Sequence, residues 1–155
     1  HLKEQYKNGC DTLMLFESWG GIVPEYYYKE ILFNPAKEIR KRLRKEKVLA
    51  PFICFPRGLN KYILPYDDFV KPNILSIDQN ISMEWAVNNF DKKKVLQGNI
   101  NPELLVSGGI DLYKNVENIM NFVHDRNHIF NTGHGIHPDT PIENIIKILE
   151  NIRKA

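Results

Sequence analysis

His128-Ile129-Phe130-Asn131-Thr132-Gly133-His134-Gly135 decides the fold, because a short apolar run stops abruptly in a glycine-rich turn. The segment that follows predicts a helix, with Thr140 as its N-cap, Pro141 as its first residue and Glu143 at the third position. A buried strand, a turn and a helix in this order are typical of one unit of a parallel α/β protein.

The same order of apolar run, polar stop and helix occurs four more times upstream. The runs are Asp11–Phe16, Pro51–Phe55, Asn73–Ile77 and Lys94–Leu96. Helices are predicted at 35–47, 59–70, 82–90 and 112–126, and the first and last of them have apolar residues three to four positions apart. Near-continuous apolar runs indicate strands buried on both faces, and alternation with helices makes those strands parallel. The sequence therefore predicts an α/β fold with about five parallel strands and outer helices.

Polar residues follow each predicted strand. They are Ser18, Arg57, Asp78, Gln97–Asn99 and His134. Ligands of parallel α/β proteins bind at the carboxyl ends of the strands, both in open sheets and in βα barrels. Any one of these stops is also an ordinary turn, but five together indicate the mouth of an active site.

Composition excludes several classes of protein. The 155 residues include 21 basic and 19 acidic residues, a net charge of +2, which is too balanced to argue for nucleic acid or an anionic membrane as partner. No run approaches the roughly 20 apolar residues of a membrane span. Cys10 and Cys54 show no disulfide or metal-binding spacing and are expected to be reduced core thiols. We expect a cytoplasmic protein.

Chain length bears on the kind of sheet. A complete βα barrel takes roughly 250 residues and eight strands, whereas this sequence holds about five. Residues 2–6 also have the character of the middle of a helix. We therefore expect residues 1–155 to be the C-terminal portion of a single barrel domain. Its N-terminal strands are absent from this sequence or supplied by a partner.

Four motifs in order resemble those of the uroporphyrinogen decarboxylase family. They are Phe16-Glu17-Ser18-Trp19-Gly20-Gly21, Leu75-Ser76-Ile77-Asp78, Leu96-Gln97-Gly98-Asn99-Ile100-Asn101-Pro102, and Phe130-Asn131-Thr132-Gly133-His134-Gly135-Ile136 with Pro138-Asp139-Thr140-Pro141. The family usually has alanine where Gly20 stands and tryptophan where Gln79 stands. These departures bear on packing more than on chemistry.

The resemblance implies a (β/α)8 TIM-barrel enzyme that removes four acetate carboxyl groups from uroporphyrinogen III to give coproporphyrinogen III. It implies no metal, no organic cofactor and a homodimer, with the tetrapyrrole as substrate. The family's essential aspartate lies in the upstream half of the barrel. The 155-residue chain alone is therefore expected to be inactive.

The resemblance also assigns candidate site residues. His134 is expected to donate to a substrate carboxylate or to help deliver a proton, and Ser18 to donate its hydroxyl to a carboxylate. From their places at strand ends rather than from the resemblance, Arg57 is expected to pair with a carboxylate, and Phe16 to form an apolar pocket wall. The structural alternatives are a capping serine, a loop histidine, a rim arginine in a salt bridge and a core phenylalanine.

Other polar residues have a structural interpretation. Asp78 is expected to orient neighbouring backbone or a basic side chain, with a catalytic role as the alternative. Gln97 and Asn99 are expected to tie the strand ends together. Two histidine pairs, His124 with His128 and His134 with His137, have spacings that suit metal ligation, but no Cys, Asp or Glu completes a set.

Two other functions remain open at this stage. One is a methyltransferase of the same barrel superfamily that uses zinc and a corrinoid protein, although no cysteine follows the second or last strand here. The other is a truncated product without catalytic activity. Trp19 and Tyr26–Tyr28, after the first predicted strand, would form a dimer surface or simply cover the barrel.

Overall fold

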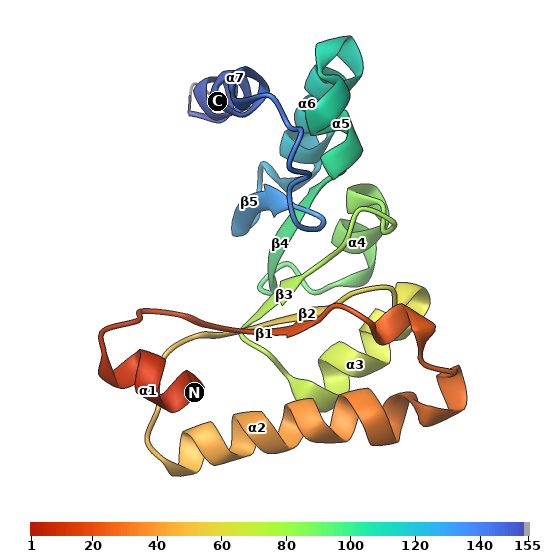
Figure 1. Ribbon diagram of the computed structural model, residues 1–155. Helices are drawn as coiled ribbons and strands as arrows, with labels where there is room; N and C mark the ends of the chain where they lie inside the picture. Colours follow the sequence, from red (N-terminus) through yellow and green to blue (C-terminus); the bar gives the residue numbers. More distant parts are fainter. Residues whose placement is uncertain (154–155) are drawn as a thin grey trace. The chain divides into compact units, whose positions relative to one another are not determined.

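The computed structural model describes residues 1–153 (Figure 1). The chain forms two compact units, His1–Ser76 and a second that begins at Ile77. Each unit contains parallel strands with helices packed on them, which confirms the predicted α/β class.

The first unit holds three parallel strands, β1 (Leu13–Glu17), β2 (Phe52–Pro56) and β3 (Ile74–Ser76). Leu15 of β1 stands opposite Cys54 of β2, and Cys54 stands opposite Leu75 of β3. Every residue of β2 is buried, as a central strand of a covered sheet requires.

Helices α1 (Leu2–Lys7), α2 (Asn34–Lys45) and α3 (Ile63–Val70) complete the first unit. Figure 1 shows α2 and α3 on the same side of β1 and β2. Two short 3-10 turns, Gly20–Ile22 and Glu25–Tyr27, and a π-helical turn, Tyr28–Phe33, lead from β1 into α2.

An aromatic cluster fixes the packing of α2 and α3. The ring of Phe33 lies edge-on to Tyr66, with centroids 5.2 Å apart, and stacks against Tyr28 at 6.4 Å. Burial raises the pKa of the Tyr66 hydroxyl far above its usual range. Tyr28, which stacks on Phe33 and is buried, belongs to the core, whereas Tyr26 is exposed.

The second unit pairs β4 (Val95–Ile100) with β5 (His128–Thr132) in parallel, with Gly98 opposite Phe130. Its helices are α4 (Met83–Asn89), α5 (Pro102–Ser107), α6 (Gly109–Val123) and α7 (Ile142–Ile152). Ser82 caps α4, as its oxygen accepts from the Trp85 amide. Helix α6 packs on α4, α5, α7 and β4.

The buried side of α6 follows the predicted spacing of three and four residues. Its buried residues are Leu112, Val116, Ile119 and Val123. This periodicity confirms the predicted amphipathic helix, although α6 begins three residues earlier than the sequence indicated, at Gly109.

Four structural expectations are wrong. Strand β4 continues through Ile100, so Gln97–Asn99 lie within the strand and are buried. Helix α7 begins at Ile142 with Pro141 as its N-cap, because the Thr140 amide donates to His137 O in a preceding turn. Strand β5 alternates between half-buried and exposed residues rather than being buried on both faces. Cys10 is exposed, whereas Cys54 is buried.

Candidate functional site

The loops after β1 and β2 meet at the carboxyl ends of these strands. The Arg57 amide donates to Glu17 O at 3.1 Å, and the Arg57 guanidinium Nη1 donates to Ser18 O at 3.3 Å. The guanidinium Nε is buried and has no hydrogen-bond partner within residues 1–153. The structure thus brings Ser18 and Arg57 together and leaves part of the arginine's donor capacity unused.

Glycines permit this close approach of the two loops. A β-carbon on Gly58 would lie 2.7 Å from Gly21 Cα, and Gly58 has a φ of +80°, which favours glycine. A β-carbon on Gly20 would lie 2.9 Å from Arg57 O. The absence of a side chain at Gly20 therefore permits the tight packing against Arg57.

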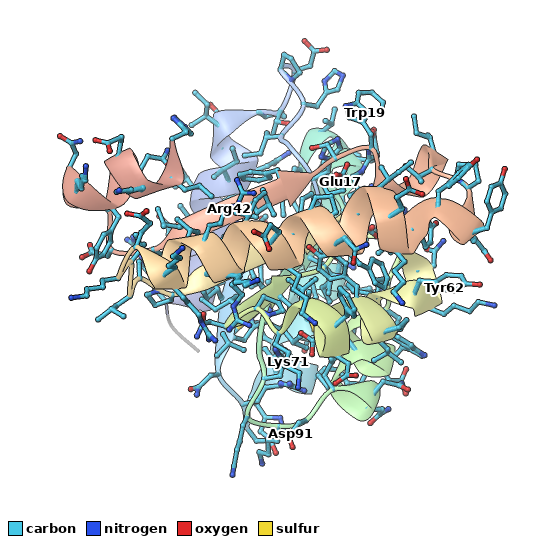
Figure 2. All side chains as sticks on the ribbon, turned by 90° about the horizontal axis from the view of Figure 1, so that it is seen from below. Glu17, Trp19, Arg42, Tyr62, Lys71 and Asp91 are labelled. Atoms are coloured by element: carbon cyan, nitrogen blue, oxygen red, sulfur yellow. The ribbon has the colours of Figure 1, made fainter. Side chains whose placement is uncertain are left out.

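Phe16 and Trp19 are the large apolar side chains at this end of β1. Figure 2 shows Trp19 beside Glu17, whose carboxylate accepts from the Trp19 amide at 3.3 Å. Phe16 is 62% exposed and its ring lies edge-on to buried Phe55, with centroids 6.2 Å apart. This exposure excludes the core alternative for Phe16 and leaves its role as a pocket wall a prediction.

His134 lies in the loop after β5, in the second unit. The His134 carbonyl accepts a hydrogen bond from the Thr132 hydroxyl at 2.6 Å. The amide of the preceding residue, Gly133, donates to Ile100 O at 2.7 Å. A β-carbon on Gly133 would collide with the Gln79 backbone, whereas one on Gly135 would meet nothing within 4 Å. Gly133 is therefore required for close packing against Gln79, whereas the space beside Gly135 is open.

The loop after β3 is held by buried polar groups. Asp78, 1% exposed, accepts from the Asn80 amide at 2.8 Å. The side-chain amide of Asn99 donates to Asp78 O at 2.9 Å and to Ile81 O at 2.5 Å. The predicted roles of Asp78 in orienting backbone and of Asn99 in tying the strand ends are confirmed.

The candidate residues thus fall into two groups. Phe16, Ser18 and Arg57 gather at the ends of β1 and β2 in the first unit, and His134 follows β5 in the second. Over residues 1–153, no three His, Cys, Asp or Glu side chains cluster closely enough to hold a metal ion. The same part of the chain contains no helix with the length and apolar character to span a membrane.

Comparison with solved structures shows a shared fold. A methyltransferase from Methanosarcina mazei superposes with a TM-score of 0.78 at 16% sequence identity, covering 98% of this chain and 45% of that protein. The two chains share the architecture of parallel strands and outer helices that characterises TIM barrels. At this low identity the likeness shows the fold alone.

Sequence comparison shows the family. Residues 1–155 match the family "Uroporphyrinogen decarboxylase (URO-D)". The uroporphyrinogen decarboxylases of Cereibacter sphaeroides and Rickettsia felis are 32% and 34% identical over 99% of this chain. The chain spans 45% and 44% of the lengths of these relatives. It belongs to the uroporphyrinogen decarboxylase family, which confirms the resemblance carried by its four motifs.

Proposed function

We propose that the protein containing this chain decarboxylates uroporphyrinogen III, removing its four acetate carboxyl groups to give coproporphyrinogen III in haem biosynthesis. The family match over all 155 residues carries this proposal. The fold supports it, because the motif residues Ser18 and His134 both follow parallel strands, where βα barrels bind their ligands.

We take residues 1–155 to be the C-terminal portion of one barrel domain. Aligned relatives are more than twice as long, since this chain covers 44–45% of them. The upstream strands and the family's essential aspartate belong to the remaining part. The 155 residues alone are accordingly not expected to turn over substrate.

The chemistry requires no organic cofactor or metal. Protonation of a pyrrole carbon turns the ring into an electron sink. The bond between the acetate methylene and its carboxyl carbon then breaks, carbon dioxide leaves, and the electron pair enters the ring. A proton delivered to the methylene carbon leaves a methyl group, and loss of the proton first added to the ring carbon restores the pyrrole. The protein must hold many carboxylates and stabilise a developing cation.

Arg57 and Ser18 suit the binding of carboxylates. Arg57 forms no salt bridge within residues 1–153, so no carboxylate of these residues neutralises its guanidinium. Its contact with Ser18 O fixes the planar fork at the strand ends. Ser18 would donate its hydroxyl to a neighbouring carboxylate, and Phe16 would cover the apolar side of the macrocycle.

His134 suits proton delivery or a hydrogen bond to a carboxylate. Its backbone is fixed by the Thr132 hydroxyl and its imidazole is half-buried, so the ring extends from a defined position. An imidazole can both donate and accept a proton, which suits it to general acid-base work. Open space around Gly135 lets a ligand approach the loop.

Purified complete protein tests the proposal through substrate consumption and stepwise products, separated by chromatography. Ser18→Ala and His134→Ala should slow decarboxylation, whereas Ser107→Ala and His124→Gln, which change exposed residues of the same types, should not. Unchanged rates for both Ser18→Ala and His134→Ala would show that these residues have a structural role only. A tightly bound equivalent of zinc would instead favour the methyltransferase chemistry.

We further propose that the complete protein works as a cytoplasmic homodimer. Trp19 and Tyr26 are 69% and 79% exposed, and large exposed aromatic side chains are enriched at interfaces. Sedimentation of the wild-type protein and of a Trp19→Ser/Tyr26→Ser variant tests this. A monomeric wild-type protein would contradict it.

A further inference from the structure

A groove of 560 Å³ lies between α2 and α3 in the first unit, away from the strand ends described above. Five of its lining side chains are cationic and one is a carboxylate. The cationic residues are Lys37, Arg40, Lys41, Arg44 and Lys71, and the carboxylate is Asp68.

The positive charge of this basic groove is poorly compensated. Glu38, which lies on α2 outside the lining, pairs with Arg42 at 3.0 Å and with Lys41 at 3.8 Å. Lys37, Arg44 and Lys71 form no salt bridge within residues 1–153. Like charges thus face one another across the groove, and their mutual repulsion favours binding of an anion.

Several of the cationic groups are held in place. Arg40 Nη1 donates to Val70 O at 2.8 Å, and Arg40 Nε is buried without a hydrogen-bond partner in the described part of the chain. Burial, and next the charge of Arg44, lower the pKa of Arg40. The Lys37 ammonium lies 3.9 Å from the centroid of the Phe69 ring. An anion entering the groove meets donors that are already ordered.

The cations form a line rather than a single point. Positions 37, 40, 41 and 44 share one face of α2 and span about 10 Å along its axis. Lys71 adds charge from the opposite bank, at the C-terminal end of α3. Figure 2 shows Lys71 and Arg42 on opposite sides of α2, and Arg42 does not line the groove.

We propose that the basic groove binds an acidic segment of a partner polypeptide, whose Asp and Glu side chains follow the line of cations on α2. Arginine forks match carboxylates in pairs of hydrogen bonds. A linear ligand fits an elongated, open groove better than a single small anion does. The remaining charge of the chain is balanced, which disfavours nucleic acid, since its backbone attracts basic charge over a wide surface.

Binding of a fluorescein-labelled deca-glutamate peptide to the complete protein, followed by anisotropy, tests this proposal. Lys41→Gln/Arg44→Gln removes two charges from the groove. Arg42→Gln/Lys45→Gln removes two charges from the same helix outside it, and all four side chains are exposed. Losing two screened ion pairs should weaken binding about tenfold, whereas the control should change it little. Circular dichroism of both variants verifies the fold.

Three outcomes would overturn the proposal. Peptide that fails to bind at low salt would exclude an acidic partner, because screening is weakest there. Equal losses of peptide affinity in the groove and control variants would show that binding depends on the overall charge of the protein and not on the groove. A labelled deca-uridylate that binds more tightly than the peptide, with the same sensitivity to Lys41→Gln/Arg44→Gln, would assign the groove to nucleic acid.

Discussion

Acidification should destabilise the protein through His128, the first residue of β5. Burial lowers the pKa of this imidazole to about 4, and the charge of Arg126 adds to that effect, while a hydrogen bond to the Gly98 backbone opposes it. The Nε2 atom is buried without a hydrogen-bond partner in the part of the chain that the structure describes. Protonation would therefore place an unpaired cationic N–H inside the protein.

The sign and size of the effect follow from the two pKa values. His128 is neutral in the folded protein down to about pH 4, whereas an unfolded chain takes up the proton near pH 6.5. The contribution of neutral His128 to stability is thus fully present above pH 6.5 and is lost as the pH falls towards 4. The complete loss amounts to about 3 kcal/mol, and about 2 kcal/mol of it falls between pH 7 and pH 5.

Urea unfolding followed by circular dichroism at pH 7 and pH 5 measures this loss. His128→Gln removes the titrating group and keeps a polar side chain of similar size, so most of the pH dependence in this range should disappear. His124→Gln is the matched control, because His124 is exposed at the end of α6. If His128→Gln loses as much stability on acidification as the wild-type protein, the burial argument is refuted.

Three further substitutions probe the loops at the strand ends and the packing of β4 by urea unfolding. Gly58→Ala should lower the free energy of unfolding by about 1–3 kcal/mol, because the new β-carbon meets the Gly21 backbone. Gly9→Ala is the control for backbone strain alone, since Gly9 has a φ of +95° and its β-carbon would meet nothing within 4 Å. Equal losses of stability in the two variants would exclude the clash as the cause. Asn99→Leu should cost about 2 kcal/mol by leaving buried carbonyls unpaired, and a neutral result would contradict that role. Arg126→Met should cost about 3 kcal/mol, since its guanidinium donates to three backbone carbonyls, and an unchanged midpoint would show that water replaces them.

Elements whose burial follows a simple period could be predicted from the sequence. The unbroken apolar run of β2 is buried throughout, and α6 buries the residues that recur at three and four positions. In both, each residue's environment is set by its own element. The hydrophobic pattern therefore carries the information directly.

The end of strand β4 could not be predicted from the hydrophobic pattern. Gln97 and Asn99 are polar, and Gly98 between them suggests a turn, so the sequence predicts a stop. In the structure Asn99 is buried because carbonyls of Asp78 and Ile81 accept from its amide. Those partners are distant in sequence, and no local pattern marks the pairing.

The candidate site shows the same division. The motifs located Ser18 and His134 at strand ends, the strand pattern alone located Arg57, and the structure places all three there. The contact between Arg57 and Ser18 O depends on two loops that meet only in the fold, through Gly21 and Gly58. The basic groove likewise needs α3 beside α2, which the sequence of α2 alone does not reveal.

Conversion of uroporphyrinogen III by the complete protein tests the central claim most directly. We expect coproporphyrinogen III, with four molecules of carbon dioxide released, from protein free of added metal and cofactor. We also expect slower turnover on Ser18→Ala and His134→Ala, with Ser107→Ala and His124→Gln unaffected. Complete protein that is folded, as judged by circular dichroism, and yet leaves uroporphyrinogen III unconsumed would contradict the claim.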